Sequence, residues 1–303
     1  MVATSFLMKK VYLFIFVGII LFTAFFMYEK KEVKILFVGE MMFDRYIRQV
    51  GNTKGEDFVF SCIDNFLKDS NLVVGNLEGP ITDNPSVSMG SVVESPENYT
   101  FTFPPSTAKL LARNNIKLVN LGNNHMLNLS RDGLLQTKMY LEEAGVGYFG
   151  DPDSVENEKV ARMELGGMPV SFVNWSDWNS DNTDITVAQI KKEAKSGQKV
   201  FVYTHWGEEY VPPPERVKRL AHSFIDAGAE MVIGSHPHII QESENYKDKL
   251  IYYSLGNFIF DQYWNKEVST GLVLEVDISG GNKLKIIEHK VSLNKDGRTC
   301  LVN

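Results

Sequence analysis

Four of the six histidines stand where an apolar run ends and polar residues begin. These four are His125, His205, His236 and His238. Residues i and i+2 of a strand lie on one side, so His236 and His238, in "VIGSHPHII", are expected to point into one cleft. A lone histidine is ordinarily a hydrogen-bonded core or surface side chain, but four at strand ends favour a metal site. His222 and His289 stand among charged residues, and we expect them to lie elsewhere.

Carboxylate and amide side chains at the same ends could supply further ligands. They are Glu40, Asp44, Glu78, Asn124, Glu208, Glu209, Asn257 and Asp261. Imidazole together with carboxylate oxygen suits a divalent transition metal, and manganese, iron and zinc all fit. For a single carboxylate the alternative is a helix cap or a solvated loop. We expect this for Glu209 and leave both readings open for Asp44.

A carboxylate shared by two metal ions would give these residues a hydrolytic chemistry. A water held between two ions loses a proton more readily and can attack phosphorus in line. A nearby protonated histidine can deliver a proton to the leaving oxygen. Such a site needs neither a cysteine nor a serine nucleophile.

An alternation of strands and helices must position these residues. Six apolar runs predict strands: "VKILFVGEMMFD" (33–44), "NLVVGNLEGP" (71–80), "IKLVNLGNNH" (116–125), "KVFVYTHWGEE" (199–209), "EMVIGSHPH" (230–238) and "LIYYSLGNFIFD" (250–261). Helical patterns cover 58–68, 106–114, 132–144, 187–196 and "PERVKRLAHSFIDAGAE", which Gly228 ends. The alternation predicts an α/β fold with helices packed outside the sheets. In such folds ligands collect at the carboxyl ends of strands.

Three further segments have distinct patterns. The alternating runs 271–279 and 282–293, around Gly280 and Gly281, predict an antiparallel hairpin at a sheet edge. Residues 82–102 are rich in Ser, Pro, Asn and Glu and predict a long loop beside the site. "GVGYFG" (145–150) matches a dinucleotide-binding fingerprint, but it follows a helical pattern and precedes a loop. We therefore reject the fingerprint and interpret Gly145 as a helix C-cap.

Composition limits the classes of function. The 303 residues are 44% hydrophobic, which is enough for a large core, and their formal charge of −7 offers no footprint for a nucleic-acid backbone. The two cysteines, Cys62 and Cys300, could form one bridge in an oxidising compartment. We expect instead two unpaired, mostly packed thiols, because two cysteines make no disulfide framework.

The N-terminus predicts a membrane anchor after a short tail (1–10). Residues 11–28 are 18 uncharged, mainly apolar residues between lysine pairs. As a helix they would be roughly 27 Å long, close to the hydrocarbon thickness of a bilayer. A cleaved signal peptide is the alternative, but no small-x-small cleavage site follows the apolar run. Lysines on both sides leave the orientation open.

The ordered motifs resemble a known family. "GEMMFDR", "NLEGPIT", "GNNHMLNLSRDGL", "HWGEEYVPPP", "GSHPHIIQ" and "SLGNFIFDQ" are similar to the CapA/PgsA capsule-synthesis family, which is linked to poly-γ-glutamate and is itself similar to calcineurin-like metallophosphoesterases. The resemblance covers 33–265, with 266–303 as C-terminal strands completing a sheet. It implies a four-layer α-β-β-α sandwich of two mixed sheets with a two-metal site at one end. It also implies a single-pass protein of the bacterial cell membrane whose main domain is extracytoplasmic.

The resemblance implies a role for each site residue. Metal ligands would be Glu40, Glu78, Asn124, His205, His236 and His238, with Glu78 bridging two divalent ions. His125 would be the catalytic proton donor, and Asn257 would contact substrate. Two positions depart from the family pattern: Glu40 stands where an aspartate is expected, and Asn128 stands where an aspartate would orient His125.

Three functions follow from these expectations. The first is a membrane-anchored, two-metal hydrolase in capsule biosynthesis, acting on a phosphoester or on the polymer. The second is a non-catalytic polymer-binding, assembly or export component beside membrane capsule-synthase subunits. The third is a metal-dependent phosphoesterase or other hydrolase unrelated to capsule. The expected partners are the cytoplasmic membrane, poly-γ-glutamate and synthase subunits, and not nucleic acid.

Overall fold

Two mixed sheets form the centre of the protein. The computed structural model describes residues 32–153, 159–178, 183–279 and 284–302. The larger sheet has the order β14 (Thr299–Leu301), β13 (Leu284–Leu293), β12 (Thr270–Ile278), β1 (Val33–Met41), β2 (Leu72–Leu77), β3 (Ile116–Asn120) and β4 (Gly147–Phe149), with β11 (Asn257–Ile259) paired to β1. The smaller sheet has the order β5 (Val160–Leu165), β6 (Met168–Ser176), β7 (Lys199–His205), β8 (Met231–Ser235), β10 (Lys249–Tyr252) and β9 (Ser243–Tyr246).

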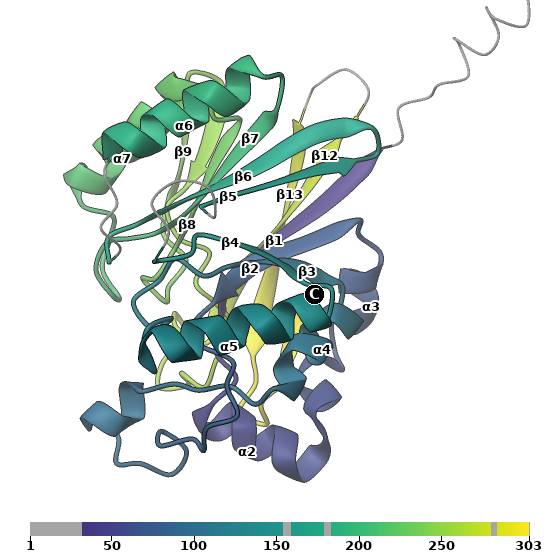
Figure 1. The fold of residues 1–303 in the computed structure, drawn as a ribbon, viewed down its shortest axis with the longest axis vertical. Coiled ribbons are helices and arrows are strands. Elements are labelled where there is room, and N and C mark those ends of the chain that lie inside the picture. Colours follow the sequence, from purple (N-terminus) through teal and green to yellow (C-terminus); the bar gives the residue numbers. More distant parts are fainter. Residues whose placement is uncertain (1–31, 154–158, 179–182, 280–283, 303) are drawn as a thin grey trace, which may run out of the picture.

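Helices cover the outer faces of both sheets (Figure 1). The larger sheet is covered by α2 (Arg45–Lys54), α4 (Ser106–Arg113) and α5 (Ser130–Glu143), and the smaller one by α6 (Thr183–Lys195) and α7 (Glu215–Ala227). Shorter elements are the 3-10 helices η1 (Glu56–Phe60) and η2 (Pro96–Tyr99) and the helix α3 (Asp64–Lys68). The result is helix, sheet, sheet and helix in four layers.

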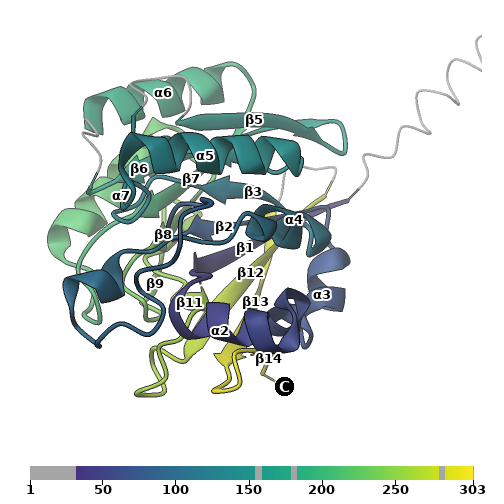
Figure 2. The same ribbon diagram turned by 60° about the horizontal axis from the view of Figure 1, so that its bottom comes forward.

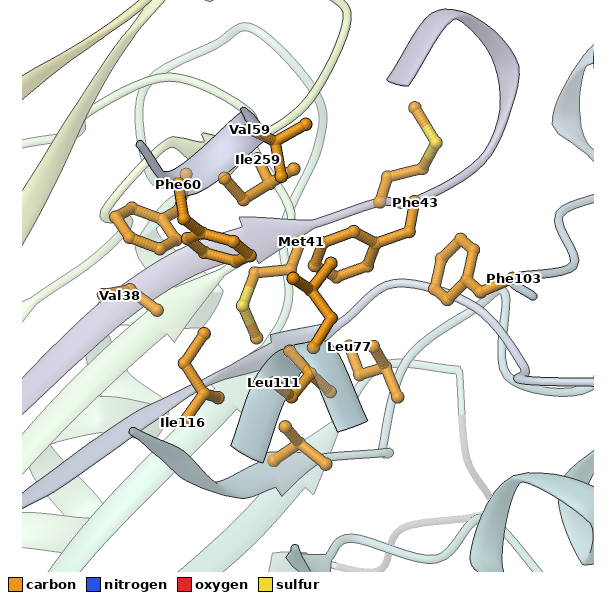
Figure 3. Packing of buried hydrophobic residues seen from close by; sticks show 14 of the residues in the cluster. Val38, Met41, Phe43, Val59, Phe60, Leu77, Phe103, Leu111, Ile116 and Ile259 are labelled. Carbon is orange, nitrogen blue, oxygen red and sulfur yellow. The ribbon is translucent and has the colours of Figure 1, made fainter. Parts of the chain in front are cut away.

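Three buried apolar clusters hold the layers together. Along β1, Ile35 and Phe37 face the smaller sheet, while Leu36 and Val38 face the helices, as the period of two in a strand requires. Between the sheets the Phe37 ring lies 5.3 Å from that of Phe201. Figure 3 shows the cluster on the helix side of the larger sheet. Each sheet is therefore apolar on both faces, as a sheet buried by helices must be.

Most predicted elements are confirmed, with some differences. The helix expected at 58–68 is broken into η1 and α3, and the single strand expected at 250–261 is divided into β10 and β11, which belong to different sheets. Elements α2, β4, β5, β6 and β9 were not predicted. The hairpin of β12 and β13 is confirmed, but its place at the sheet edge is wrong, because β12 also pairs with β1 and β14 forms the edge beyond β13. Gly145 follows α5 with φ 70°, and the next element is the strand β4, so the dinucleotide fingerprint is correctly rejected.

The expectation of two unpaired, packed thiols is wrong. Cys62 and Cys300 form a disulfide with their Cα atoms 4.8 Å apart, and Cys62 is exposed. Strand β14 runs beside the α2–α3 segment (Figure 2), which brings Cys300 to a residue 238 positions earlier in the chain. No local sequence pattern indicates a contact between residues so far apart in the chain.

The predicted tail and anchor, 1–28, lie outside the described residues, as does the turn at Gly280 and Gly281. Within the described part of the chain, none of the helices has both the length and the apolar character needed to cross a bilayer.

Candidate metal centre

The predicted site residues converge at the carboxyl ends of parallel strands from both sheets. Strands β1, β2 and β3 are parallel neighbours, and so are β7 and β8. Glu40 lies near the end of β1 and Glu78 follows β2. His205 is the last residue of β7, and His236 directly follows β8. The two sheets thus contribute carboxylates and imidazoles to one place.

Two groups of possible ligands share one carboxylate. The first contains Glu40, Glu78 and His205, and the second contains Glu78, His236 and His238. In each group the ligand atoms lie within 4.8 Å of one another, and all five residues are buried. Glu78 belongs to both groups, which is the arrangement expected of a carboxylate that bridges two ions.

Glu40 is aimed into the centre by a close approach of two strands. A Cβ atom at Gly39 would lie 1.9 Å from the carbonyl oxygen of Gly256, so only glycine fits there. The backbone N–H of Glu40 donates to this same carbonyl at 3.1 Å. The Glu40 carboxylate then accepts a hydrogen bond of 2.5 Å from the backbone N–H of His236, which links β1 to the loop after β8.

A buried asparagine, Asn76, holds the two carboxylates and was missed by the sequence analysis. Its Nδ2 donates to both Glu40 and Glu78. Asn76 stands two residues before Glu78, and the period of two in a strand could have indicated that both side chains share one side.

Further buried amides continue from Asn76 to the smaller sheet. Its Oδ1 accepts from the Nδ2 atoms of Asn120, at 2.9 Å, and Asn123, at 3.1 Å. Asn120 Oδ1 in turn accepts from Nδ2 of Asn174, on β6, at 2.8 Å. Asn123 Oδ1 accepts from the backbone N–H of His125 at 3.0 Å. This asparagine network, Asn76, Asn120, Asn123 and Asn174, connects the carboxylates to both sheets.

His205 is fixed by hydrogen bonds at both ring nitrogens. Its Nδ1 lies 3.0 Å from Ser235 Oγ and its Nε2 lies 2.8 Å from Asn124 Oδ1. The same nitrogens lie 3.7 Å from Glu40 and from Glu78, respectively. Asn124 is therefore placed beside the first ligand group.

His236 and His238 share the centre, but not for the predicted reason. Strand β8 ends at Ser235, and both histidines have left-handed backbone conformations, with φ of 98° and 58°. The expectation that strand alternation aligns them is wrong, because a turn does so. Backbone strain of this kind is stored preferentially at functional sites.

Asn257 lies behind His238 and is fully buried. Its Oδ1 is 2.8 Å from His238 Nδ1, and its Nδ2 donates to Gln262 Oε1 and to the Val268 carbonyl, each at 2.9 Å. The arrangement orients the imidazole of His238. The substrate contact of Asn257 stays a prediction.

His125 sits at the edge of the centre against the loop 82–102. Its ring lies 4.4 Å from that of Phe101, which confirms that this loop borders the site. Its Nδ1 is 3.1 Å from Asn128 Oδ1, which also accepts from the backbone N–H of Phe101 at 2.8 Å. Asn128 therefore retains an orienting contact to His125, although it carries no charge.

The donor set fits divalent cations. Glu78 Oε1 and His236 Nδ1 are buried and have no hydrogen-bond partner among the described residues. Buried polar atoms without partners are costly, and a cation would satisfy both. The indole of Trp178, 4.1 Å from the His236 ring and 5.2 Å from that of His205, packs against the centre and was not predicted.

Burial sets the protonation of these groups in the metal-free chain. It raises the pKa of Glu78 well above its usual range, and the Glu40 charge adds to this. Burial lowers the pKa of His205 well below its usual value, and that of His236 to about 3. It lowers the pKa of His125 to about 4, with smaller contributions from His238 and Arg45. Neutral imidazoles present free lone pairs, which is the form that binds metal.

The remaining acidic candidates lie outside the two ligand groups. Asp44 is buried, and its carboxylate accepts from Ser86 Oγ at 2.6 Å and from the backbone N–H of Thr102 at 2.9 Å, so it pins the loop 82–102. Asp261 pairs with Arg45. Glu208 and Glu209 are exposed. His222 and His289 bond Glu244 and Glu275, each at 2.8 Å, away from the centre.

These features define the class: an α/β protein of two facing mixed sheets with a carboxylate–histidine cluster at the carboxyl ends of parallel strands. The bacterial capsule synthesis protein family PGA_cap matches residues 34–262. The chain belongs to this family, and the CapA/PgsA resemblance seen in its motifs is confirmed.

Curated relatives carry related names. The capsule biosynthesis protein CapA of Bacillus anthracis is 31% identical over 265 residues, covering 81% of this chain and 64% of that protein. The PGA biosynthesis protein CapA of Bacillus subtilis is 29% identical over 266 residues, covering 81% and 68%. A Mycobacterium tuberculosis protein named "Probable polyglutamine synthesis accessory protein" is 29% identical over 169 residues, covering 46% and 44%. This chain thus spans about two thirds of the length of the Bacillus proteins.

Among solved structures, Chaetomium thermophilum Vps29 aligns with 66% of this chain and 86% of its own at 16% identity. The TM-score of 0.30 is too low to carry an argument.

Proposed function

We propose that this chain is a membrane-anchored, extracytoplasmic protein of poly-γ-glutamate capsule biosynthesis that holds two divalent metal ions in a metallophosphoesterase-type site. The observation that carries the metal site is the shared carboxylate of Glu78, which lies in both ligand groups. Family membership and the names of the Bacillus relatives support the capsule role.

The residues divide into two ligand sets around Glu78. Glu40 and His205 would complete one set, with Asn124 next to it, and His236 and His238 would complete the other. When bound, the ions would supply Lewis acidity and lower the pKa of a coordinated water. The chain's own part is to hold the carboxylates through Asn76, to orient His238 through Asn257, and to pack the Trp178 ring against His236.

We assign proton delivery to His125, at the edge of the site. Asn128 fixes its Nδ1 side, and Phe101 packs on its ring. In the metal-free chain its pKa of about 4 keeps the imidazole neutral at pH 7. A donor role therefore requires that bound substrate raises this pKa, as a substrate anion close to the ring would.

The neutral state of His125 favours a second candidate function. If the imidazole stays neutral with substrate bound, the site binds polymer and metal without hydrolysis, as an assembly or export component would. The ligand geometry is the same in both cases, so function must be decided by assay.

The disulfide supports the proposed location. Disulfides persist in oxidising compartments and are rare in the bacterial cytoplasm. The bond between Cys62 and Cys300 joins exposed and partly exposed positions, where a reducing environment would reach it. An extracytoplasmic domain tethered by residues 11–28 accounts for this bond.

Metal analysis of the full chain in detergent tests the proposal. After reconstitution with manganese, iron or zinc, we expect about two ions per chain, fewer than one in Glu78→Gln, and two in the exposed control Glu209→Gln. Equal metal in the wild-type chain and Glu78→Gln would refute the site. Hydrolysis of a γ-linked glutamate oligomer would then favour a capsule enzyme. Hydrolysis of a phosphodiester alone would favour a phosphoesterase unrelated to capsule. Binding of the oligomer without hydrolysis would favour the assembly role.

A further inference from the structure

Arg45, in the motif "GEMMFDR", is a cation held rigidly beside the candidate metal centre. It is the first residue of α2 and has a left-handed backbone conformation, with φ of 48°. Its guanidinium lies between two phenyl rings, 5.2 Å from the centre of Phe101 and 5.3 Å from that of Phe260. The side chain is 14% exposed.

Both flanking rings also touch site histidines. The Phe101 ring lies 4.4 Å from that of His125, and the Phe260 ring lies 4.9 Å from that of His238. The charge of Arg45 is therefore separated by one aromatic layer from the proposed proton donor and from a proposed metal ligand.

Not all N–H groups of the Arg45 guanidinium have a hydrogen-bond acceptor among the described residues. Of its five N–H groups, one on Nη1 donates to Asn98 Oδ1 at 3.3 Å and one on Nη2 donates to Asp261 Oδ1. Its Nε is buried and has no partner among the described residues. A guanidinium whose N–H groups are only partly used, next to the candidate metal centre, is suited to bind a planar or tetrahedral oxyanion.

Acidic side chains near the candidate metal centre make the positive charge of Arg45 important for binding an anionic substrate. The nearby loop after β7 carries the exposed carboxylates Glu208 and Glu209. Arg216, close to that loop, is held by both oxygens of Asp177 at 2.7 Å. A polyanion that reaches the centre would meet these acidic side chains, and a positive contact besides the metal ions would offset their repulsion.

We propose that Arg45 forms a substrate-binding subsite that holds an oxyanion of the substrate next to the metal centre, the carboxylate of a γ-linked glutamyl residue or a phosphoryl group. This inference rests on the proposed function and adds a specificity-determining residue to it. Asp261 occupies part of the fork in the free chain and competes with the incoming anion.

Two variants with opposite expected effects test the subsite in the full chain. Arg45→Lys keeps the charge but loses the fork, and we expect the dissociation constant of a γ-linked glutamate pentamer to rise about tenfold, the loss of roughly one charge-assisted hydrogen bond. Asp261→Asn removes the competing charge, keeps an acceptor for the Tyr46 backbone N–H and should lower the constant several-fold. Arg113→Lys, in an exposed pair with Asp57, is the matched control and should change nothing.

Titration calorimetry with the pentamer and, separately, with inorganic phosphate identifies the source of the oxyanion. If the two variants change the dissociation constant of phosphate in these directions but do not change that of the pentamer, the subsite binds a phosphoryl group. Three results would overturn the inference. Arg45→Lys could bind both probes as tightly as the wild-type chain does, or the wild-type chain could bind neither probe. Asp261→Asn could weaken binding as much as Arg45→Lys does, which would show that the Arg45–Asp261 pair has only a structural role. Metal content is measured in parallel; a chain without metal refutes the proposed function, while the comparison of variants still decides the role of Arg45.

Discussion

Asn174 donates a hydrogen bond from its amide to Oδ1 of Asn120 at 2.8 Å, and this contact joins the two sheets directly behind the candidate metal centre. Both side chains are buried. Because Asn120 donates in turn to Asn76, the position of the carboxylates depends on the spacing between the sheets. The asparagine network therefore links the packing of the core to the geometry of the site.

Replacing Asn76 with aspartate should destabilise the metal-free chain. The change removes the donor shared by Glu40 and Glu78 and adds a third buried carboxylate, so we expect the free energy of unfolding to fall by about 3 kcal/mol. Urea unfolding in the presence of a chelator measures it. Asn65→Asp, at an exposed position of α3, is the control and should stay within about 0.5 kcal/mol of wild type. Equal effects of the two variants would contradict the network.

The metal-free chain should lose stability as the pH falls below about 6.5, the ordinary pKa of histidine. The folded chain holds the pKa of His125 at about 4 and that of His236 at about 3, so the unfolded chain takes up protons first. The loss of stability continues until the pH falls below the pKa values of the folded chain. Each unit of difference between the folded and unfolded pKa of a histidine corresponds to about 1.4 kcal/mol. Unfolding curves between pH 7 and pH 3 measure it.

A variant separates the histidines from the carboxylates, which also titrate in this range. His236→Asn suits the left-handed backbone and removes one depressed pKa. The variant should lose stability less steeply with falling pH than the wild-type chain does. An identical slope would show that His236 does not contribute.

If the chain hydrolyses a probe substrate, His125→Ala should lower kcat by about 10²- to 10⁴-fold, the range for loss of a general acid. Metal content should not change, because His125 belongs to neither ligand group. His222→Ala, on the outer helix α7, is the matched control. Full activity in His125→Ala would exclude the proton-donor role.

Breaking the disulfide should reduce stability, because the bond closes a long loop and so lowers the entropy of the unfolded chain. Removing a bridge between residues 238 positions apart is expected to cost about 2–5 kcal/mol. Thermal or urea unfolding of the double variant Cys62→Ser, Cys300→Ser measures this cost. A reductant should destabilise the wild-type chain and leave the double variant unchanged; stability that does not respond to reductant would contradict the prediction.

Local patterns in the sequence were sufficient to predict much of the fold. Helix α7 and its end at Gly228 follow from apolar spacing and from the left-handed residue that ends the helix. The apolar run at 33–44 predicts β1, and the structure then assigns its alternate residues to opposite apolar layers. The ends of these strands also located the candidate ligands, because a parallel sheet gathers its carboxyl ends at one edge.

The remaining features depend on contacts that no local pattern encodes. The run containing Asn174 was not recognised as a strand, so its contact with Asn120 could not be expected. His236 and His238 were placed correctly for a wrong reason, since a left-handed turn aligns them. Arg45 and Trp178 became visible as neighbours of the site only when loops from different parts of the chain were brought together.

The bond between Cys62 and Cys300 has a consequence for resistance to proteolysis. It encloses most of the folded chain in one covalent ring, from the turn before α3 to β14, and β1 and α2 precede the ring. A protease that cuts an exposed loop inside this ring would open it without releasing a fragment. The nicked protein would keep both sheets, and with them both halves of the candidate metal centre, in one molecule.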